Sequence, residues 1–229
     1  MNKIMNTKRI SIFYLILTAT AMLVFTACSK DDIDSDNDVV IWEYATSIDP
    51  SGKAMVIKTS NIDNGNNDIS SAKVTLGYQS LDGEWHYLEY SAEYENGGFE
   101  LHLPITIPDE FLSPSSNVLL YEDNIHLSDI NAKNIYANII AYNSDGDNIG
   151  SFSFSSDKWQ MAILYADRNY TEKGITNSGF EYNCSYQRGW NVVYYYWDVT
   201  NSKITTQRPK NEKFKCYFSV NMAEYLYLN

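Results

Sequence analysis

The alternation of apolar and polar residues constrains the fold of this chain most. It runs from residue 39 to residue 220 and is interrupted by short clusters of Asn, Asp and Gly. A period of two residues places apolar side chains on one face of a strand, whereas an amphipathic helix needs a period of 3.6. Nineteen Tyr, nine Phe and five Trp further favour pleated, half-buried surfaces. We predict strands at residues 39–44, 54–59, 72–79, 85–94, 98–103, 134–142, 149–155, 158–166, 180–186, 190–197 and 213–220.

The segments between these strands are turn sequences. Leu-Asp-Gly-Glu at 81–84, Glu-Asn-Gly-Gly at 95–98 and Asn-Ser-Asp-Gly-Asp-Asn at 143–148 are typical of hairpins. Short strands at this spacing predict an all-β fold, an antiparallel β-sandwich. Pro104, Pro108 and Pro114 mark a change in composition, which predicts two packed modules, 39–112 and 113–229. One continuous sandwich is the alternative.

Residues 1–27 have the organisation of a secretory signal peptide. Lys3, Lys8 and Arg9 precede an apolar run over 10–25, which is too short for a comfortable membrane span. The run ends in Phe-Thr-Ala-Cys at 25–28, which resembles the lipobox of bacterial lipoproteins. The resemblance implies cleavage before Cys28 and a lipid on its sulfur, which would anchor the protein to a membrane. An ordinary signal peptide with an incidental cysteine is the alternative.

Residues 28–38 are predicted to form a solvated acidic tether. Ser-Lys-Asp-Asp at 29–32 resembles the surface-export signal of Bacteroidota lipoproteins, so we expect the domain at the outer membrane, facing the cell surface. A calcium loop is the alternative, because oxygen ligands fall at EF-hand spacing. These are Asp32, Asp34, Asp36, Asp38 and Glu43. The loop lacks the turn glycine and flanking helices of an EF-hand, so we predict no metal site.

The net charge limits the partners of the protein. The whole chain carries a formal charge of −12, and removing residues 1–27 would remove three basic residues and no acidic one, leaving about −15. Binding to nucleic acid depends on neutralising phosphates, so we predict no nucleic-acid partner. Direct adsorption to anionic headgroups is disfavoured for the same reason. The predicted contact with the membrane is therefore the lipid on Cys28.

The two remaining cysteines leave two interpretations open. In their predicted strands, Cys184 and Cys216 alternate with aromatic residues, so both thiols point toward an apolar side. An even pair of cysteines in an exported protein suggests a disulfide. Two separate buried thiols that pack as small hydrophobic groups explain the pattern equally well.

Two further resemblances cover much of the chain. Ile-Ser-Ser-Ala-Lys-Val-Thr-Leu at 69–76 and Gly-Gly-Phe-Glu-Leu-His-Leu-Pro at 97–104 resemble Ig-like or prealbumin-like modules of exported proteins. Ala-Tyr-Asn-Ser-Asp-Gly, Leu-Tyr-Ala-Asp-Arg, Arg-Gly-Trp-Asn-Val-Val-Tyr and Lys-Phe-Lys-Cys-Tyr-Phe, between 141 and 218, are similar to an uncharacterised group of Bacteroidota surface lipoproteins. Neither resemblance implies an activity.

The sequence contains no recognisable catalytic motif. Nucleophilic hydrolysis by Ser or Cys usually needs a histidine base, and only His86, His102 and His126 exist. No Gly-x-Ser-x-Gly, His-Glu-x-x-His, Cys-x-x-Cys or glycine-rich phosphate motif occurs, so we predict no cofactor. Paired carboxylates cleave glycosides without such motifs. A carbohydrate-active enzyme is therefore the alternative to a non-catalytic module.

Aromatic side chains carry the prediction of binding. Tyr195 and Trp197 share one face of their strand, and flat rings stack on the apolar faces of sugars. We predict a non-catalytic module that binds a glycan or an envelope protein, with Trp85, Trp190, Tyr195 and Trp197 as candidate ligand-binding residues. A central strand buried on both faces is the alternative explanation. Exposure of these rings, and of Trp159, distinguishes the two.

Overall fold

The computed structural model describes residues 41–43, 55–64, 67–80, 83–120, 124–198 and 201–220. It gives only the backbone of residues 41–43 and 120. The predicted signal peptide, Cys28 and the acidic tether lie outside these ranges, as do the aspartates of the calcium-loop alternative.

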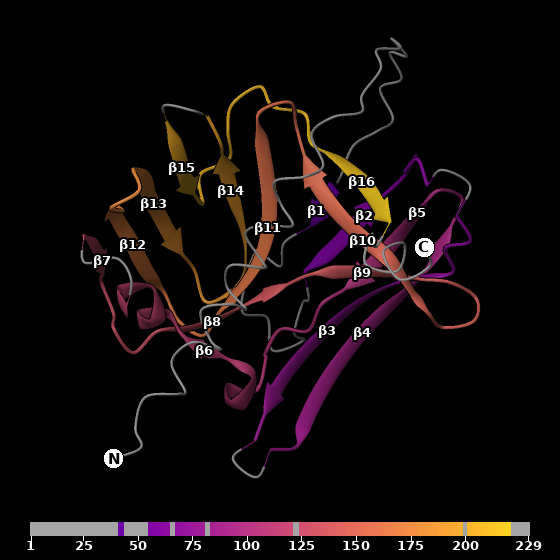
Figure 1. Ribbon diagram of the computed structural model, residues 1–229, viewed down its shortest axis with the longest axis horizontal. Helices are drawn as coiled ribbons and strands as arrows, with labels where there is room; N and C mark the ends of the chain where they lie inside the picture. Colours follow the sequence, from indigo (N-terminus) through magenta and orange to yellow (C-terminus); the bar gives the residue numbers. More distant parts are fainter. Residues whose placement is uncertain are drawn as a thin grey trace, which may run out of the picture. The chain divides into compact units, whose positions relative to one another are not determined.

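The prediction of an all-β fold is confirmed (Figure 1). The described residues form sixteen strands and two short 3-10 helices. The strands are β1 (Ile41–Glu43), β2 (Val56–Thr59), β3 (Ser71–Gln79), β4 (Trp85–Glu95), β5 (Gly98–His102), β6 (Ser113–Pro114), β7 (Ile125–Leu127), β8 (Lys133–Ala137), β9 (Ile139–Tyr142), β10 (Asn148–Ser155), β11 (Trp159–Ala166), β12 (Tyr170–Ile175), β13 (Phe180–Tyr186), β14 (Gly189–Tyr196), β15 (Ser202–Thr205) and β16 (Lys215–Val220). The 3-10 helices are η2 (Asp109–Phe111) and η3 (Ser115–Leu120).

Hydrogen bonds connect the strands in the order β1-β2-β5-β4-β3-β9-β10-β11-β14-β15-β13-β12-β7. Outside this order, β16 pairs with β10, β8 pairs with β11, and β6 pairs with β8. The long strand β4 changes partner along its length, because residues 85–93 pair with β3 and residues 94–95 pair with β5. Each strand pair among the described residues is antiparallel except β13 with β15, which is parallel. The purely antiparallel prediction is corrected at this one pair.

The larger hydrophobic core lies between strands that face each other. Phe99 of β5 contacts Phe152 of β10, with ring centroids 4.9 Å apart, although the two strands are not neighbours in the sheet. Tyr94 of β4 stacks on Phe152 from the same side. Ile57, Val74 and Ile163, from three further strands, are buried in this core. The facing strands give a two-layered arrangement, as in a β-sandwich.

The strands on the two sides of the predicted module boundary are hydrogen-bonded to each other. Residues 71–74 of β3 pair with residues 139–142 of β9. The larger core also contains residues from both predicted modules, such as Leu101 and Ile163. A smaller core lies on strands β11 to β15 and includes Leu164, Cys184 and Val193. Figure 1 shows β11, β14, β15, β13 and β12 side by side, as their hydrogen bonds require.

The predicted strand over 134–142 is two strands in the structure. Residues 133–137 (β8) pair with β11, and residues 139–142 (β9) pair with β10 and β3, so the chain changes partner at Asn138. Strands β6, β7, β12 and β15 lie outside the predicted strand ranges. Strands β6, β7 and β15 have only two to four residues, and in β12 the buried Glu172 stands where the alternation calls for an apolar residue.

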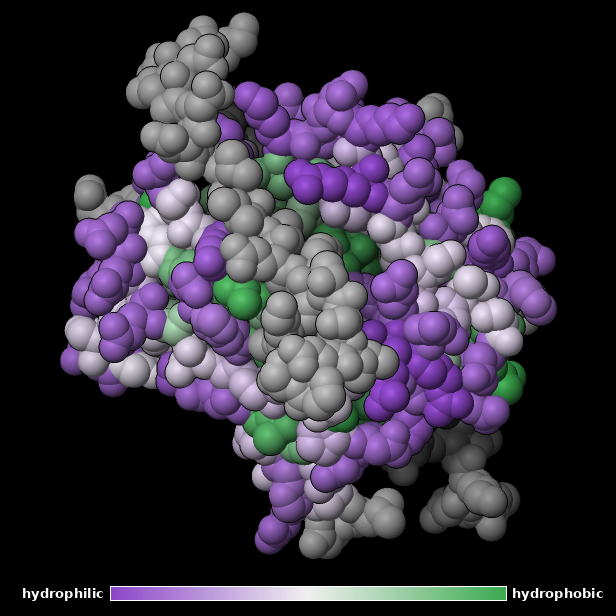
Figure 2. Space-filling model, turned by 180° about the vertical axis from the view of Figure 1, so that it is seen from behind, coloured by the Kyte–Doolittle hydropathy of each residue, from purple (hydrophilic) through white to green (hydrophobic). Residues whose placement is uncertain are grey.

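Hydrophilic residues dominate the described surface on the face shown in Figure 2, where hydrophobic residues occupy small separate patches. Among the described residues, no helix is long and apolar enough to cross a membrane.

Candidate functional site

Trp85 and Tyr87 of β4 form an exposed pair of parallel rings, which we call the aromatic platform. Trp85 is 57% exposed and Tyr87 is 62% exposed. Their ring centroids are 6.0 Å apart and their planes differ by 11°. Exposed large rings are ordinary when single, but two adjacent parallel rings on one face expose a larger continuous apolar surface.

The hairpin of β3 and β4 positions the aromatic platform. Residues 75–79 and 85–89 pair only with each other among the described strands, because β9 reaches no farther along β3 than Val74. Gly77 lies opposite Tyr87, and a Cβ at Gly77 would be 3.0 Å from a Tyr87 ring carbon. The missing side chain at Gly77 therefore lets the Tyr87 ring lie close over β3.

The opposite face of the same hairpin is held against the rest of the fold. Tyr78 stacks on His86 with centroids 4.8 Å apart, and its edge meets the buried Phe111 of η2 at 4.8 Å. Because neighbouring residues of a strand point to opposite faces, packing of Tyr78 and His86 leaves Trp85 and Tyr87 pointing outward.

Trp190 and Tyr195, two other predicted binding residues, are half-buried and engaged in contacts with the fold. The Trp190 indole N–H donates a hydrogen bond of 2.6 Å to the carbonyl of Pro104, and its ring meets Tyr165 edge-on at 5.3 Å. The Tyr195 hydroxyl donates to the Tyr136 hydroxyl at 2.9 Å. We interpret both Trp190 and Tyr195 as structural residues.

Trp197 is 46% exposed and stacks on Tyr195, with centroids 6.3 Å apart and planes 12° apart. The edge of Phe180 also packs on Trp197 at 5.0 Å. Of the four predicted binding residues, only Trp85 and Trp197 are exposed, and Trp85 lies on β4 whereas Trp197 directly follows β14. The structure therefore does not bring the four together into one site.

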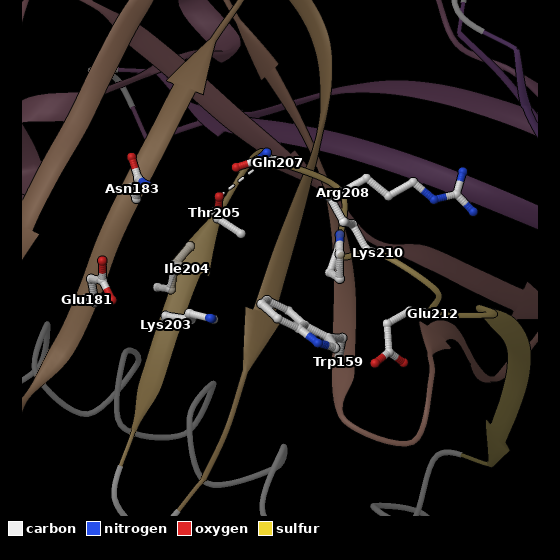
Figure 3. Close-up of a pocket in the computed structure, with 11 residues that line it drawn as sticks. Trp159, Glu181, Asn183, Lys203, Ile204, Thr205, Gln207, Arg208, Lys210 and Glu212 are labelled. Carbon is white, nitrogen blue, oxygen red and sulfur yellow. Dashed lines mark hydrogen bonds between the residues drawn. The ribbon is translucent and has the colours of Figure 1, made fainter.

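A cavity of about 400 Å³ lies on the face of the sheet that carries Trp159 (Figure 3). We call it the basic pocket. Strand register builds its floor as a row across four strands: Glu181 (β13) lies opposite Lys203 (β15), Lys203 opposite Tyr196 (β14), and Tyr196 opposite Trp159 (β11). Asn183 and Thr205 come from the next row on the same face and also line the pocket.

The segment between β15 and β16 forms the wall of the basic pocket. It contributes Gln207, Arg208, Pro209, Lys210 and Glu212. Thr206 ties its start to β13, because its hydroxyl accepts a 2.9 Å hydrogen bond from the Ser185 N–H and donates one to the Ser185 carbonyl. At its end, the buried Phe214 packs on Tyr194, with centroids 5.4 Å apart. The wall is therefore fixed at both ends.

The basic pocket holds an ammonium group in a defined place. The Lys203 Nζ lies 5.2 Å from the ring centroid of Trp159 and 5.6 Å from that of Tyr196. Attraction between a cation and the faces of two rings holds the group there, while its N–H donors remain available to a ligand. Arg208 adds a positive field that acts on the Tyr194 hydroxyl and opposes the rise in its pKa caused by burial.

Charged side chains of both signs line the basic pocket. Figure 3 shows Glu181 at one side of the cavity and Glu212 at the other, with Lys203 and Trp159 between them. Three cationic side chains, Lys203, Arg208 and Lys210, outnumber the two acidic ones in this lining.

The histidines and metal candidates form no second site in the described part of the chain. His86, His102 and His126 lie on β4, β5 and β7, and His102 contacts Glu100 at 2.9 Å. Among the described residues, no group of three or more His, Cys, Asp and Glu side chains is arranged to hold a metal ion.

The disulfide alternative for Cys184 and Cys216 is corrected, because both are free thiols in the structure. Cys184 is fully buried in the smaller core, whereas Cys216 packs against the larger core. Burial raises the pKa of Cys184 to about 11 and also raises the pKa of Cys216. The interpretation that survives is two separate thiols that pack as small hydrophobic groups.

No known family model, curated protein or solved structure matches the chain. The resemblance to Bacteroidota surface lipoproteins therefore stays a prediction. Of the site residues, the sequence pattern identified Trp85 of the aromatic platform but did not identify the basic pocket. The signal for the pocket is non-local, since the row from Glu181 to Trp159 depends on the parallel pairing of β13 with β15.

Proposed function

We propose that this protein is a lipid-anchored, non-catalytic module that binds glycans at the cell surface through the aromatic platform. The observation that carries the proposal is the exposed, parallel pair of rings at Trp85 and Tyr87. Sugars present apolar C–H faces that stack on such rings, while the Tyr hydroxyl and the Trp N–H supply polar contacts beside them.

The surroundings of the aromatic platform support a glycan ligand. Gln79 lies directly opposite Trp85 and shares its face, as Gly77 does with Tyr87. The next pair on that face is Thr75 and Glu89, so hydrogen-bonding side chains border the rings. An obligate protein interface has a larger continuous apolar core than two rings bordered by polar groups.

The proposed location follows from the leader and the tether. A lipid on Cys28 would hold the domain at the outer membrane without a spanning helix, and the acidic residues after Cys28 would direct it to the cell surface. A binding module held there captures polysaccharide from the surroundings or contributes a binding surface to a larger envelope assembly.

The test is retardation of the full-length protein during native electrophoresis in gels that contain a neutral polysaccharide, using xylan, galactomannan, mixed-linkage β-glucan and starch in turn. At least one should retard the wild type. Trp85→Ala and Tyr87→Ala should each weaken binding several-fold, and the double variant about 10-fold or more. Trp197→Ala, which removes a similarly exposed Trp elsewhere, is the matched control and should bind as the wild type does. Equal retardation of all variants would refute the assignment of the platform.

A further inference from the structure

We infer that the basic pocket is a second binding site, which takes a sugar residue that bears an anionic group, either a carboxylate or a sulfate ester. The inference does not rest on the aromatic platform, because the pocket is built from β11, β13, β14, β15 and the segment after β15.

The charges of the basic pocket point to an anionic ligand. The chain as a whole carries a charge of −12, yet Lys203, Arg208 and Lys210 gather around one cavity. The ion pairs found among the described residues involve other side chains, such as Lys73 with Glu89 and Arg168 with Asp167. No carboxylate of the described residues therefore neutralises these three cations within ion-pair distance, although the protein is rich in acids.

The position of Lys203 makes the pocket selective for charge. Its ammonium lies over both Trp159 and Tyr196, so these rings hold a cation and do not offer an open face to a neutral sugar. A cation fixed in advance loses little conformational entropy when an anion binds it. Hydrogen bonds between charged partners are about twice as strong as neutral ones, which favours a carboxylate or sulfate at this point.

The remaining lining residues suit the hydroxyl groups of a sugar. Asn183 and Gln207 have amides that donate and accept, and Glu181 accepts hydrogen bonds from hydroxyls. A volume of about 400 Å³ lies within the range of small-molecule sites, about 300–1,000 Å³. A simple inorganic anion would leave these side chains unused.

The wall of the basic pocket is also prepared for binding. Thr206 and Phe214 fix its two ends, so Arg208 and Lys210 are held close to the floor without a ligand. Figure 3 shows Lys210 on the same side of the cavity as Trp159, with Glu181 on the other side. An anionic group near Lys203 thus has a second ammonium available across the cavity.

The experiment is calorimetric titration of the full-length protein, in detergent at physiological salt, with two matched pairs of probes. The first pair is oligogalacturonate and its methyl ester, and the second is a sulfated galactan oligosaccharide and its desulfated form. At least one charged probe should bind 10-fold or more tightly than its neutral partner. Lys203→Gln should lose that advantage, and Lys158→Gln, an exposed lysine outside the lining, should keep it.

Arg208→Gln and Lys210→Gln keep the test decisive if Lys203→Gln does not fold. Both residues are exposed on the wall, so their replacement should not disturb folding. Each should weaken binding of the charged probe several-fold at unchanged thermal stability. Equal binding of charged and neutral probes, or no binding of either charged probe, would overturn the inference. Inorganic sulfate that binds as tightly as the sulfated oligosaccharide would also overturn it, since the sugar would then contribute nothing.

The two proposals fail separately. Lys203→Gln should keep the retardation by neutral polysaccharide, and the Trp85→Ala, Tyr87→Ala double variant should keep the affinity for the charged oligosaccharide. Loss of both activities in either variant would show that the aromatic platform and the basic pocket are not independent sites.

Discussion

The Tyr186 hydroxyl donates a 3.0 Å hydrogen bond to the carboxylate of Glu172, which is only 6% exposed in the smaller core. Burial raises the pKa of Glu172 from 4.5 to about 7, and the hydrogen bond from Tyr186 opposes part of that rise. The carboxyl therefore keeps its proton in the folded protein at pH values where it is ionised in the unfolded chain.

This pKa shift predicts how stability depends on pH. Between about pH 4.5 and pH 7 the folded state binds more protons at Glu172 than the unfolded state does. The contribution of Glu172 to the free energy of unfolding is thus full at low pH, falls across this window, and changes no further above it. Its total fall is on the order of 3 kcal/mol.

Glu172→Gln should remove this dependence, because a glutamine does not titrate and its oxygen still accepts the Tyr186 hydrogen bond. The free energy of unfolding, measured with denaturant, should fall from pH 5 to pH 8 by up to about 3 kcal/mol more in the wild type than in the variant. Glu181→Gln, an exposed glutamate on the opposite face of the sheet, is the control. An identical pH profile for Glu172→Gln and the wild type would contradict the prediction.

Gly77→Ala tests whether the aromatic platform depends on the missing side chain at residue 77. The new methyl group would meet Tyr87 ring carbons at 3.0 and 3.1 Å, so the exposed ring must move aside. Stability should change by less than about 1 kcal/mol, because a surface ring can shift and Gly→Ala also restricts the unfolded chain. Retardation by the neutral polysaccharide should nevertheless weaken. Unchanged retardation would mean that the close approach of Tyr87 to β3 is incidental.

Trp190→Phe separates a structural residue from a binding residue. The variant loses the hydrogen bond to Pro104 and part of the contact with Tyr165, which should cost about 1–2 kcal/mol of unfolding free energy. Binding of neutral and acidic glycans should stay at the level of the wild type. The opposite result, intact stability with weakened binding, would return Trp190 to the candidate ligand contacts.

The sequence located strands well where one face is buried. The predicted strand 180–186 coincides with β13, and 149–155 matches β10 to within one residue. It failed at β15, which has only four residues with Ile204 alone buried, and at β12, where Glu172 occupies an inward position and breaks the alternation. The exception at Glu172 has a physical explanation, because burial raises the pKa of its carboxyl and the group keeps its proton.

The candidate site was predictable only in part. Exposure of Trp85 and Tyr87 follows from a hairpin tip that no third described strand covers, but alternation alone does not distinguish this tip from a buried strand. Local sequence patterns did not predict the basic pocket. Its residues lie between positions 159 and 212, and pairing across four strands brings them together.

The free thiols give a prediction about reactivity. Burial raises the pKa values of Cys184 and Cys216, so little thiolate exists near neutral pH and both should resist alkylation in the folded protein. After denaturation without reductant, both should be alkylated. Mass measurement of the peptides that contain residues 184 and 216 checks this. Alkylation that requires prior reduction would reveal a disulfide instead.

The proposed anchor gives the last prediction. If the Cys28 sulfur carries lipid, mature protein from cells should show only two alkylatable thiols after denaturation, although the full chain has three cysteines. Cys28→Ala should abolish incorporation of labelled fatty acid and release the protein from membranes, because several acyl chains supply the binding energy. Its affinity for glycans should be unchanged, since both binding sites lie well after the tether. Equal membrane retention of Cys28→Ala would show that another part of the chain holds the protein there.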